Sequence, residues 1–243
     1  MQPTSRWTYR RLQSDVGVEI SDWAGAASPS LAPHFHDETQ ISAVFTGYRL
    51  FQIGQQVFRV MAGEFAIIPA ATPHCSRGAK HVPTRSRDMF VDPVRCPVER
   101  SATVLIGSFP NGTATPDDTA MDAVLRAASS SGLRRYTLSL GSSLPDELCE
   151  AVRNSDMSIG RIADLSPLSR EGFIRRFTRE MGMTPHAWRL ASKATRARAY
   201  LRLSLPPAAT AHECGFADQS HLGRIFRKNF GTTPAAYRKV WQG

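Results

Sequence analysis

Two patterns of hydrophobic and polar residues divide this chain. Between residues 34 and 74, short runs such as I-S-A-V-F, R-L-F-Q-I and Q-V-F-R-V are separated by Gly47 and Gly54. Short alternating runs between glycines are typical of β-strands in a meander or barrel. One or two more strands are expected within residues 1–30, and others at 88–91 and 103–106.

After Pro145 the pattern becomes helical. Apolar residues recur every three or four positions, and Ser169 and Gly182 stand where a helix cap and a helix stop belong. The expected helices span residues 146–154, 159–165, 170–181 and 186–203, with a shorter one after Pro207. The long fourth helix has one buried face, formed by Trp188, Ala191, Ala194, Ala197 and Leu201.

The segment 110–140 has the Gly, Ser, Thr, Pro and Asp content of a linker. An amphipathic helix interrupts it at residues 119–128, where it either serves association or covers the open side of the barrel. The predicted domains are therefore 1–140, which includes this linker, and 141–243.

The helical half contains a tandem repeat. At an offset of 49 residues, F-I-R-R-F at 173–177 aligns with L-G-R-I-F at 222–226, and the match continues through G-x-T-P-x-A-W/Y-R. In each copy Ser or Asp can cap the helix, one face is apolar, and the other face is polar and basic.

Charge separates the same two halves. Residues 1–140 hold 14 Lys and Arg against 12 Asp and Glu, whereas residues 141–243 hold 16 against 9. A basic excess confined to one half indicates a nucleic-acid-binding half, although a solvated basic face would look the same. The four cysteines form no C-x-x-C pair, so neither a zinc knuckle nor a disulfide framework is indicated.

No run of about 18 apolar residues occurs, and M-Q-P-T-S-R-W-T-Y-R lacks a hydrophobic signal core. We expect a cytoplasmic protein without a membrane partner.

The repeat closely resembles the double helix-turn-helix domain of AraC/XylS-type bacterial transcriptional regulators. The resemblance covers residues 145–240 and rests on A-D-L-S-P-L-S-R-E-G-F-I-R-R-F and A-H-E-C-G-F-A-D-Q-S-H-L-G-R-I-F. It implies an α+β multidomain protein in which a cupin-like β-barrel precedes an all-α tandem helix-turn-helix domain. It also implies that two recognition helices enter adjacent major grooves of double-stranded DNA.

Carried over by position, the resemblance assigns two sets of DNA-binding residues. Arginine suits guanine edges and glutamine suits adenine edges, whereas contacts to phosphates position the protein without specifying sequence. Base edges would be met by Arg170, Glu171, Ile174, Arg175, Gln219, Ser220, Gly223 and Arg224, and phosphates by Arg176, Arg179, Arg227, Lys228 and Arg238.

The second copy departs from the family pattern. Thr210 replaces an aliphatic residue, and Pro206 and Pro207 precede it. We therefore expect the second copy to be less rigid, and the first copy to carry more of the sequence specificity.

The N-terminal half contains P-H-F-H-D-E at 33–38 and G-E-F-A-I-I-P-A-A-T-P-H at 63–74, which resemble the two signatures of a cupin barrel. In many regulators of this family such a barrel binds an organic effector without metal. The candidate effector-binding residues are His34, His36, Phe45, Phe51, Ile53 and His74. Gln40 and Ile41 occupy the positions where a metal-binding cupin has glutamate. We therefore expect no metal or other cofactor, with a three-nitrogen site of His34, His36 and His74 as the alternative.

The predicted function is a sequence-specific DNA-binding transcriptional regulator, an activator or a repressor, controlled by a small molecule in the barrel, and not an enzyme. The alternatives are a metal-dependent cupin enzyme, such as a dioxygenase or isomerase, and a constitutive DNA binder whose barrel only dimerises. RNA polymerase and a second copy of the chain are further candidate partners.

Overall fold

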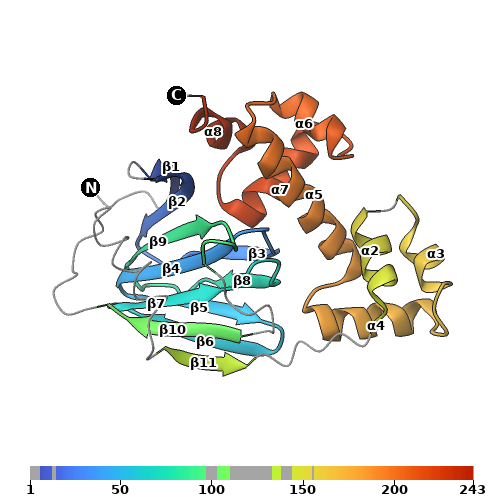
Figure 1. Cartoon of the computed structure of the whole chain (residues 1–243), viewed down its shortest axis with the longest axis horizontal. Helices are drawn as coiled ribbons and strands as arrows, with labels where there is room; N and C mark the ends of the chain where they lie inside the picture. Colours follow the sequence, from blue (N-terminus) through green and yellow to red (C-terminus); the bar gives the residue numbers. More distant parts are fainter. Residues whose placement is uncertain are drawn as a thin grey trace.

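The computed structural model describes residues 6–12, 15–96, 103–109, 133–137, 144–154 and 156–242. Its first half consists of strands and its second half of helices, which confirms the α+β multidomain fold class (Figure 1). The strands are β1 (Arg6–Leu12), β2 (Asp15–Gly25), β3 (Leu31–His34), β4 (Thr39–Thr46), β5 (Tyr48–Ile53), β6 (Gln56–Met61), β7 (Glu64–Ile68), β8 (His74–Arg77), β9 (Thr84–Val91), β10 (Thr103–Ser108) and β11 (Arg134–Thr137).

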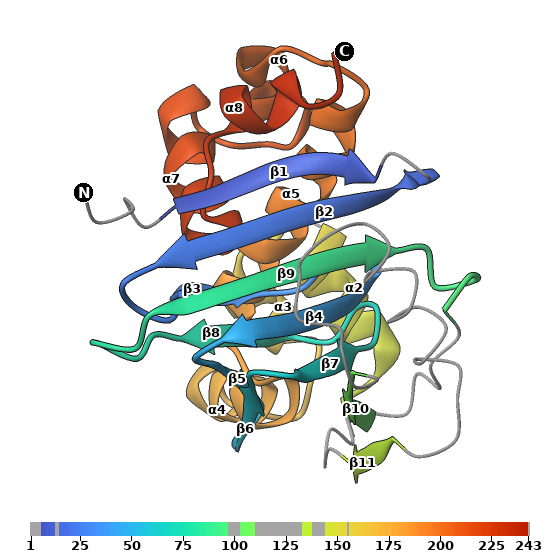
Figure 2. The same cartoon turned by 90° about the vertical axis from the view of Figure 1, so that its left-hand side faces the viewer.

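The strands form two antiparallel sheets that face each other. The seven-stranded sheet has the order β1-β2-β9-β4-β7-β10-β11, and the four-stranded sheet has the order β3-β8-β5-β6. Figure 2 shows the larger sheet in front, with most of the helices behind it and α6 and α8 above it. Strand β11 lies inside the segment predicted as a linker. The domain boundary near residue 140 remains a prediction, and the helix expected at 119–128 falls outside the described residues.

The space between the sheets has an apolar end and a polar end. At one end Phe51, Ile53, Phe58 and Val60 pack with residues of β7 and β10. At the other end the buried groups are polar: Arg49 donates hydrogen bonds to Ser42, Ser76 and Asp88. Buried polar groups need partners, and the three buried histidines of this domain lie at this polar end.

The helices follow the predicted pattern closely. The sequence predicts 170–181, and α4 has those bounds, whereas α5 begins and ends one residue earlier than expected. The helices are α2 (Asp146–Asn154), α3 (Ile159–Ala163), α4 (Arg170–Met181), α5 (Pro185–Arg202), α6 (Pro207–Glu213), α7 (Gln219–Phe230) and α8 (Pro234–Lys239).

We call α3, α4 and the start of α5 the first unit, and α6, α7 and α8 the second unit. The long helix α5 joins them, and its five predicted inward residues are all buried. At about 1.5 Å per residue, its 18 residues span about 27 Å. None of the described helices is long and apolar enough to cross a membrane.

The strand domain contributes one aromatic ring to the core of each unit. Phe35, which follows β3, is buried with Phe173, Phe177 and Trp188 of the first unit, and its ring centroid lies 4.7 Å from that of Trp188. Tyr9 of β1 packs into the core of the second unit. The two domains therefore share their cores, and their relative position is set by buried contacts.

Candidate functional site

The first recognition helix is α4, and its ends are set by local chemistry. The hydroxyl of Ser169 accepts a hydrogen bond from the backbone N–H of Gly172, which satisfies one of the free donors at the start of a helix. At the other end Gly182 adopts φ 73°, a left-handed conformation that glycine takes at little cost. Phe173 and Phe177 are fully buried, so the opposite face of α4 points outward.

That outward face carries most of the predicted contacts of the first unit. Arg170, Glu171, Arg175 and Arg179 are exposed, and Ile174 is half-buried. Arg176 is also half-buried, because its Nε donates to Glu180 Oε1 at 2.9 Å. Four of the six predicted side chains of this helix are thus free to reach outward.

The second recognition helix, α7, is built in the same way. The carboxylate of Asp218 accepts a hydrogen bond from the backbone N–H of His221 at 2.6 Å, and Gly231 ends the helix with φ 70°. Leu222 and Phe226 are fully buried. The exposed side chains are Gln219, Ser220, Arg224, Arg227 and Lys228, and no atom outside the helix approaches within 4 Å of the position a side chain would take at Gly223.

Arg238 differs from the other predicted DNA contacts. It lies in α8, is half-buried, and its Nε donates a hydrogen bond to the carbonyl oxygen of Ser204 at 2.7 Å. Its guanidinium thus joins α8 to the end of α5 within the helical domain.

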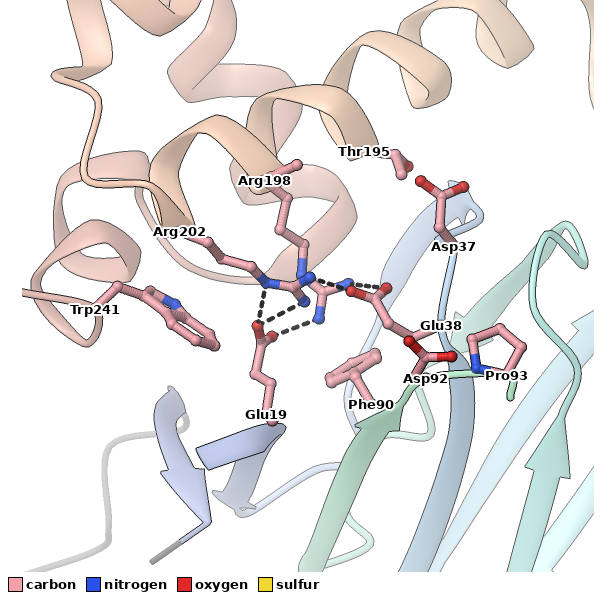
Figure 3. Close-up of a pocket in the computed structure, with 12 residues that line it drawn as sticks. Glu19, Asp37, Glu38, Phe90, Asp92, Pro93, Thr195, Arg198, Arg202 and Trp241 are labelled. Carbon is pink, nitrogen blue, oxygen red and sulfur yellow. Dashed lines mark hydrogen bonds and ion pairs between the residues drawn. The ribbon is translucent and has the colours of Figure 1, made fainter. Parts of the chain in front are cut away.

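A buried cluster of charges joins the strand domain to α5 and α8. Arg198 contacts Glu19 on β2 and Glu38 in the segment after β3, and Arg202 contacts the same two carboxylates. The hydroxyl of Tyr237 donates a hydrogen bond to Glu19. Figure 3 shows both carboxylates turned toward the two guanidinium groups. We call these five residues the Arg198 cluster.

The pKa values in the Arg198 cluster reflect burial and charge together. Burial alone would raise the pKa of Glu38, but the charges of Arg198 and Arg202 outweigh it and lower that pKa to about 2. Glu38 therefore stabilises the fold at pH values above its ordinary pKa of 4.5, and this contribution is lost as the pH falls toward 2. Burial and the neighbouring Glu19 raise the pKa of Tyr237, which keeps its proton.

Sequence reasoning missed the Arg198 cluster. Glu38 stands in the P-H-F-H-D-E motif, yet its partners lie 160 or more residues away along the chain. The only local signal was a pair of arginines four residues apart on α5, which is also typical of a solvated helix face.

Beside the cluster lies a cavity of about 360 Å³ between β2, β9 and α5. Its lining includes Asp37, Phe90, Asp92 and Trp241 as well as residues of the Arg198 cluster. None of the six predicted effector-binding residues lines this cavity.

Those six residues occupy three different places. His34, His36 and His74 come together at the polar end of the space between the sheets, and all three are buried. Phe51 and Ile53 are part of the apolar core at the other end. Phe45 packs on the opposite face of the larger sheet, where its ring stacks against Phe109 at 5.9 Å.

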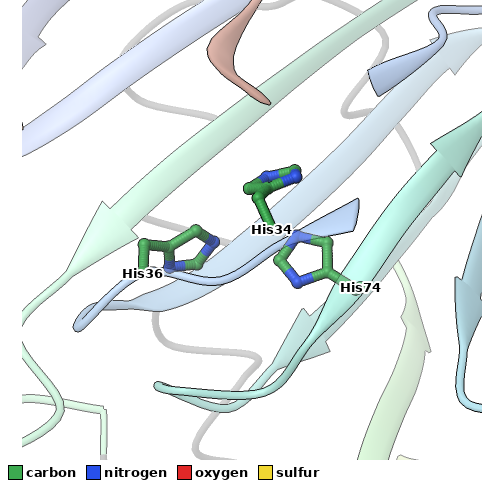
Figure 4. Close-up of side chains that lie close together, drawn as sticks. All are labelled: His34, His36 and His74. Carbon is green, nitrogen blue, oxygen red and sulfur yellow. The ribbon is translucent and has the colours of Figure 1, made fainter. Parts of the chain in front are cut away.

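Each histidine ring is held by a hydrogen bond to a backbone carbonyl. Nδ1 lies 2.8 Å from the oxygen of Ala32 in His34, 2.8 Å from that of Glu38 in His36, and 2.9 Å from that of Thr72 in His74. A carbonyl only accepts, so Nδ1 carries the proton in each neutral ring and Nε2 keeps its lone pair. Figure 4 shows the three rings turned toward a common point.

The surroundings keep these rings neutral. Burial, followed by the charge of His36, lowers the pKa of His34 to about 3. Burial likewise lowers the pKa of His36 and His74. Nε2 of His74 is buried without a hydrogen-bond partner in the described structure, and Nε2 of His36 lies 2.9 Å from Oε1 of Gln40.

Two family models match the chain, one in each domain. A helix-turn-helix domain model matches residues 162–240, and an AraC-like ligand binding domain model matches residues 23–77. The first match begins within α3 and covers the rest of both units, and the second covers the three histidines and the four-stranded sheet.

Curated relatives match part of the chain. The transcriptional activator NphR of Rhodococcus sp is 35% identical over 89 residues, which are 36% of this chain and 26% of NphR. The HTH-type transcriptional activator RhaS of Escherichia fergusonii is 35% identical over 101 residues, which are 41% of this chain and 34% of RhaS. The chain thus spans about a quarter to a third of the length of these relatives.

Among solved structures, ToxT from Vibrio cholerae has a similar fold. In its unsaturated fatty acid-bound form it aligns with a TM-score of 0.54 at 10% identity, over 100% of this chain and 98% of ToxT. At this identity the likeness concerns the fold alone.

Proposed function

We propose that this chain is a transcriptional regulator of the AraC/XylS type that binds specific DNA sequences under the control of a ligand held by its strand domain. The two family-model matches and the likeness to NphR and RhaS support this proposal. The observation that carries the proposal is the pair of capped recognition helices, α4 and α7, each with a buried aromatic face and an exposed polar and basic face.

We assign the base-reading role to exposed side chains near the start of each recognition helix. Arg175 and Arg224 occupy equivalent positions in the two units, and both are exposed. Forked donors of arginine suit the O6 and N7 edge of guanine, and Gln219 suits adenine. Arg179, Arg227 and Lys228 lie further along the same faces and suit phosphates. Arg176 and Arg238 are assigned weaker phosphate contacts, because each is half-buried and donates a hydrogen bond within the protein.

The ligand's influence on DNA binding would pass through the shared cores and the Arg198 cluster. A ligand can shift the arrangement of the two domains only by binding one arrangement more tightly than another. Contacts from β2 and from residues 35–38 reach α5, which carries both units, so a small movement of the strand domain alters how α4 and α7 are presented.

The remaining assignments follow from this function. We propose that the protein acts in the cytoplasm, that it is not an enzyme, and that RNA polymerase and a second copy of the chain are its macromolecular partners besides DNA. The matched relatives are transcriptional regulators, which supports a regulatory rather than a catalytic role.

Selection of bound fragments from a random DNA pool, at a stated salt concentration, tests the proposal. We expect enriched fragments to contain two short motifs about one helical turn apart, because two units joined by α5 meet adjacent grooves on one face. Enrichment without any sequence preference would contradict specific binding. The same selection with the double variant Arg175→Ala, Arg224→Ala serves as the control and should lose both motifs.

A further inference from the structure

The three histidines His34, His36 and His74 form an arrangement that an organic pocket does not require. Their side chains come from β3, from the segment after it and from β8, and their ligand atoms lie within 4.8 Å of one another. Each Nδ1 is bonded to a backbone carbonyl, so the free lone pairs belong to Nε2. In metal-binding histidines, a hydrogen bond from the ring nitrogen that does not hold the metal fixes the tautomer and the orientation of the ring.

We propose that His34, His36 and His74, with Oε1 of Gln40 as a fourth ligand, bind one divalent transition-metal ion, and that this ion is the effector of the strand domain. The effector role rests on the proposed function, whereas the metal site does not.

The ring positions agree with this proposal. Three imidazoles bound through Nε2 at about 2.0–2.1 Å have ring centroids about 4.5–5.2 Å apart, depending on whether the ion is octahedral or tetrahedral. The observed centroid distances are 4.5 Å between His34 and His74, 5.2 Å between His36 and His74, and 6.0 Å between His34 and His36. Only the distance between the rings of His34 and His36 must shorten when the ion binds, and a rotation within the segment after β3 would shorten it.

Gln40 is placed to complete the ligand set. Its Oε1 lies 2.9 Å from Nε2 of His36, which is about the spacing of two ligand atoms on one small ion. In the metal-free protein the amide can turn its NH₂ group toward His36 instead, because an amide reverses without changing shape. Nε2 of His74 is buried without a hydrogen-bond partner in the described structure, and a buried nitrogen of this kind is available as a metal ligand.

The nearby charges permit a cation. Arg49, at the same polar end of the strand domain, is paired with Asp88 at 2.6 Å. Arg198 is paired with Glu19 and Glu38. Neutral imidazoles favour zinc, nickel, iron, cobalt or copper over magnesium or calcium, which prefer oxygen ligands.

The site lies next to a small pocket and is connected to the helices. A small pocket of about 80 Å³, lined by His74, Cys75, Gly54 and Met183, lies between the strand domain and the end of α4. Residues 34–38 connect the site to the helices. Nδ1 of His36 is hydrogen-bonded to the backbone carbonyl of Glu38, and the carboxylate of Glu38 contacts Arg198 and Arg202. The carbonyl of Phe35 accepts a hydrogen bond from Thr195 of α5. An ion that draws His34 and His36 together would therefore move groups that contact α5.

The first experiment measures metal binding on the full chain. After treatment with a chelator, the protein is titrated with Zn²⁺, Ni²⁺ and Co²⁺, with Mg²⁺ and Ca²⁺ as controls. We expect one equivalent of each transition metal to bind, and bound Co²⁺ to give visible absorption from its nitrogen ligands. Mg²⁺ and Ca²⁺ should not bind at the site. Absence of stoichiometric binding would overturn the proposal.

Variants identify the ligands. His74→Ala and His34→Ala should each weaken Co²⁺ binding more than about 100-fold. Removing a group that only hydrogen-bonds to a metal ligand typically weakens binding about 10–100-fold, so a larger loss indicates a direct ligand. His212→Ala is the matched control, since His212 is exposed on α6 and far from the site. Gln40→Glu should tighten binding about tenfold or more, because a carboxylate brings a full negative charge to the ion. This gain cannot come from misfolding, and an unchanged affinity would remove Gln40 from the ligand set.

The second experiment tests the effector role separately. Affinity for a selected DNA fragment is measured with Zn²⁺ and with chelator, and we expect a change of about fivefold or more that His74→Ala abolishes. If the ion binds but DNA affinity stays constant, the effector role is wrong. If the ion binds and no DNA sequence is preferred at all, the proposed function is wrong and the metal site stands.

Discussion

The two helix-turn-helix units have the same local design but different surroundings. Ser169 and Asp218 cap α4 and α7, Gly182 and Gly231 end them with φ of 73° and 70°, and both helices bury an apolar pair at the same spacing, to which α7 adds Phe230. The strand domain, however, holds the first unit mainly through the apolar ring of Phe35 and the second unit through polar contacts. A repeated sequence therefore determines the fold of each unit without determining how the rest of the protein holds it.

Equivalent positions in the repeat make the difference clear. Trp188 of the first unit packs against Phe35, whereas its counterpart Tyr237 donates a hydrogen bond to Glu19 within the Arg198 cluster. The double proline of the second unit starts α6, with Pro207 in its first turn, and Thr210 is fully buried. The expectation that the second unit is less rigid stays a prediction.

The largest effect should come from removing the side chain of Arg198, which joins α5 to Glu19 and Glu38 of the strand domain beside the second unit. Arg198→Ala leaves Glu19 buried with fewer positive partners, and loss of one partner of a buried ion pair costs about 3–5 kcal/mol. Chemical denaturation should show this loss in the free energy of unfolding. Arg196→Ala on the same helix is the control and should cost under about 1 kcal/mol, because Arg196 is exposed. Equal losses in the two variants would contradict a special role for the cluster.

The two helix-ending glycines offer a direct test of the different surroundings. Alanine at either position adopts a left-handed conformation at a cost of about 1–2 kcal/mol. At Gly231 an added Cβ would also lie 2.0 Å from Cδ1 of Trp7, whereas at Gly182 the nearest atoms are 3.4 Å away. We expect Gly231→Ala to cost about 1–3 kcal/mol more than Gly182→Ala in thermal or chemical unfolding. Equal costs would mean that the second unit can move away from β1 freely.

Base reading should depend on both units. Arg175→Ala and Arg224→Ala should each weaken binding to a selected DNA fragment by about 1–3 kcal/mol and relax preference at one base position. Lys228→Ala, a predicted phosphate contact, should weaken all sequences equally. If the first unit carries more specificity, the loss at Arg175 exceeds that at Arg224 in competition binding assays. Unchanged preferences in both variants would reject α4 and α7 as reading helices.

The smallest effect concerns one hydrogen bond between the strand domain and the second unit. The hydroxyl of Tyr9 donates to the carbonyl oxygen of Phe230 at 2.6 Å, and burial raises the pKa of this phenol. Tyr9→Phe keeps the ring and removes the donor, so we expect a loss of about 0.5–1.5 kcal/mol in the free energy of unfolding. Tyr200→Phe, on the half-buried side of α5, is the control and should change it less.

Much of the fold could be predicted because its signals are local. Caps at Ser169 and Asp218, glycine stops and helical periodicity each act within a few residues, and the structure confirms the helices they predict. Strands β3 and β8 were missed because they have only four residues each, and β11 because it lies in a segment with linker composition. The candidate pocket residues were harder to predict, since strand register decides which face a side chain takes. Phe45 and Phe51 illustrate this, because they belong to different cores.

By itself, the sequence determined the two capped recognition helices, the long helix between them and the motif that contains His34 and His36, because hydrogen bonds and side-chain periodicity within a few residues specify them. Only the tertiary structure brought His74 beside those histidines, turned Glu19 and Glu38 toward Arg198 and Arg202, and placed Trp7 against Gly231. These contacts join residues that are distant along the chain, so they depend on strand register and domain packing, which no short stretch of sequence encodes.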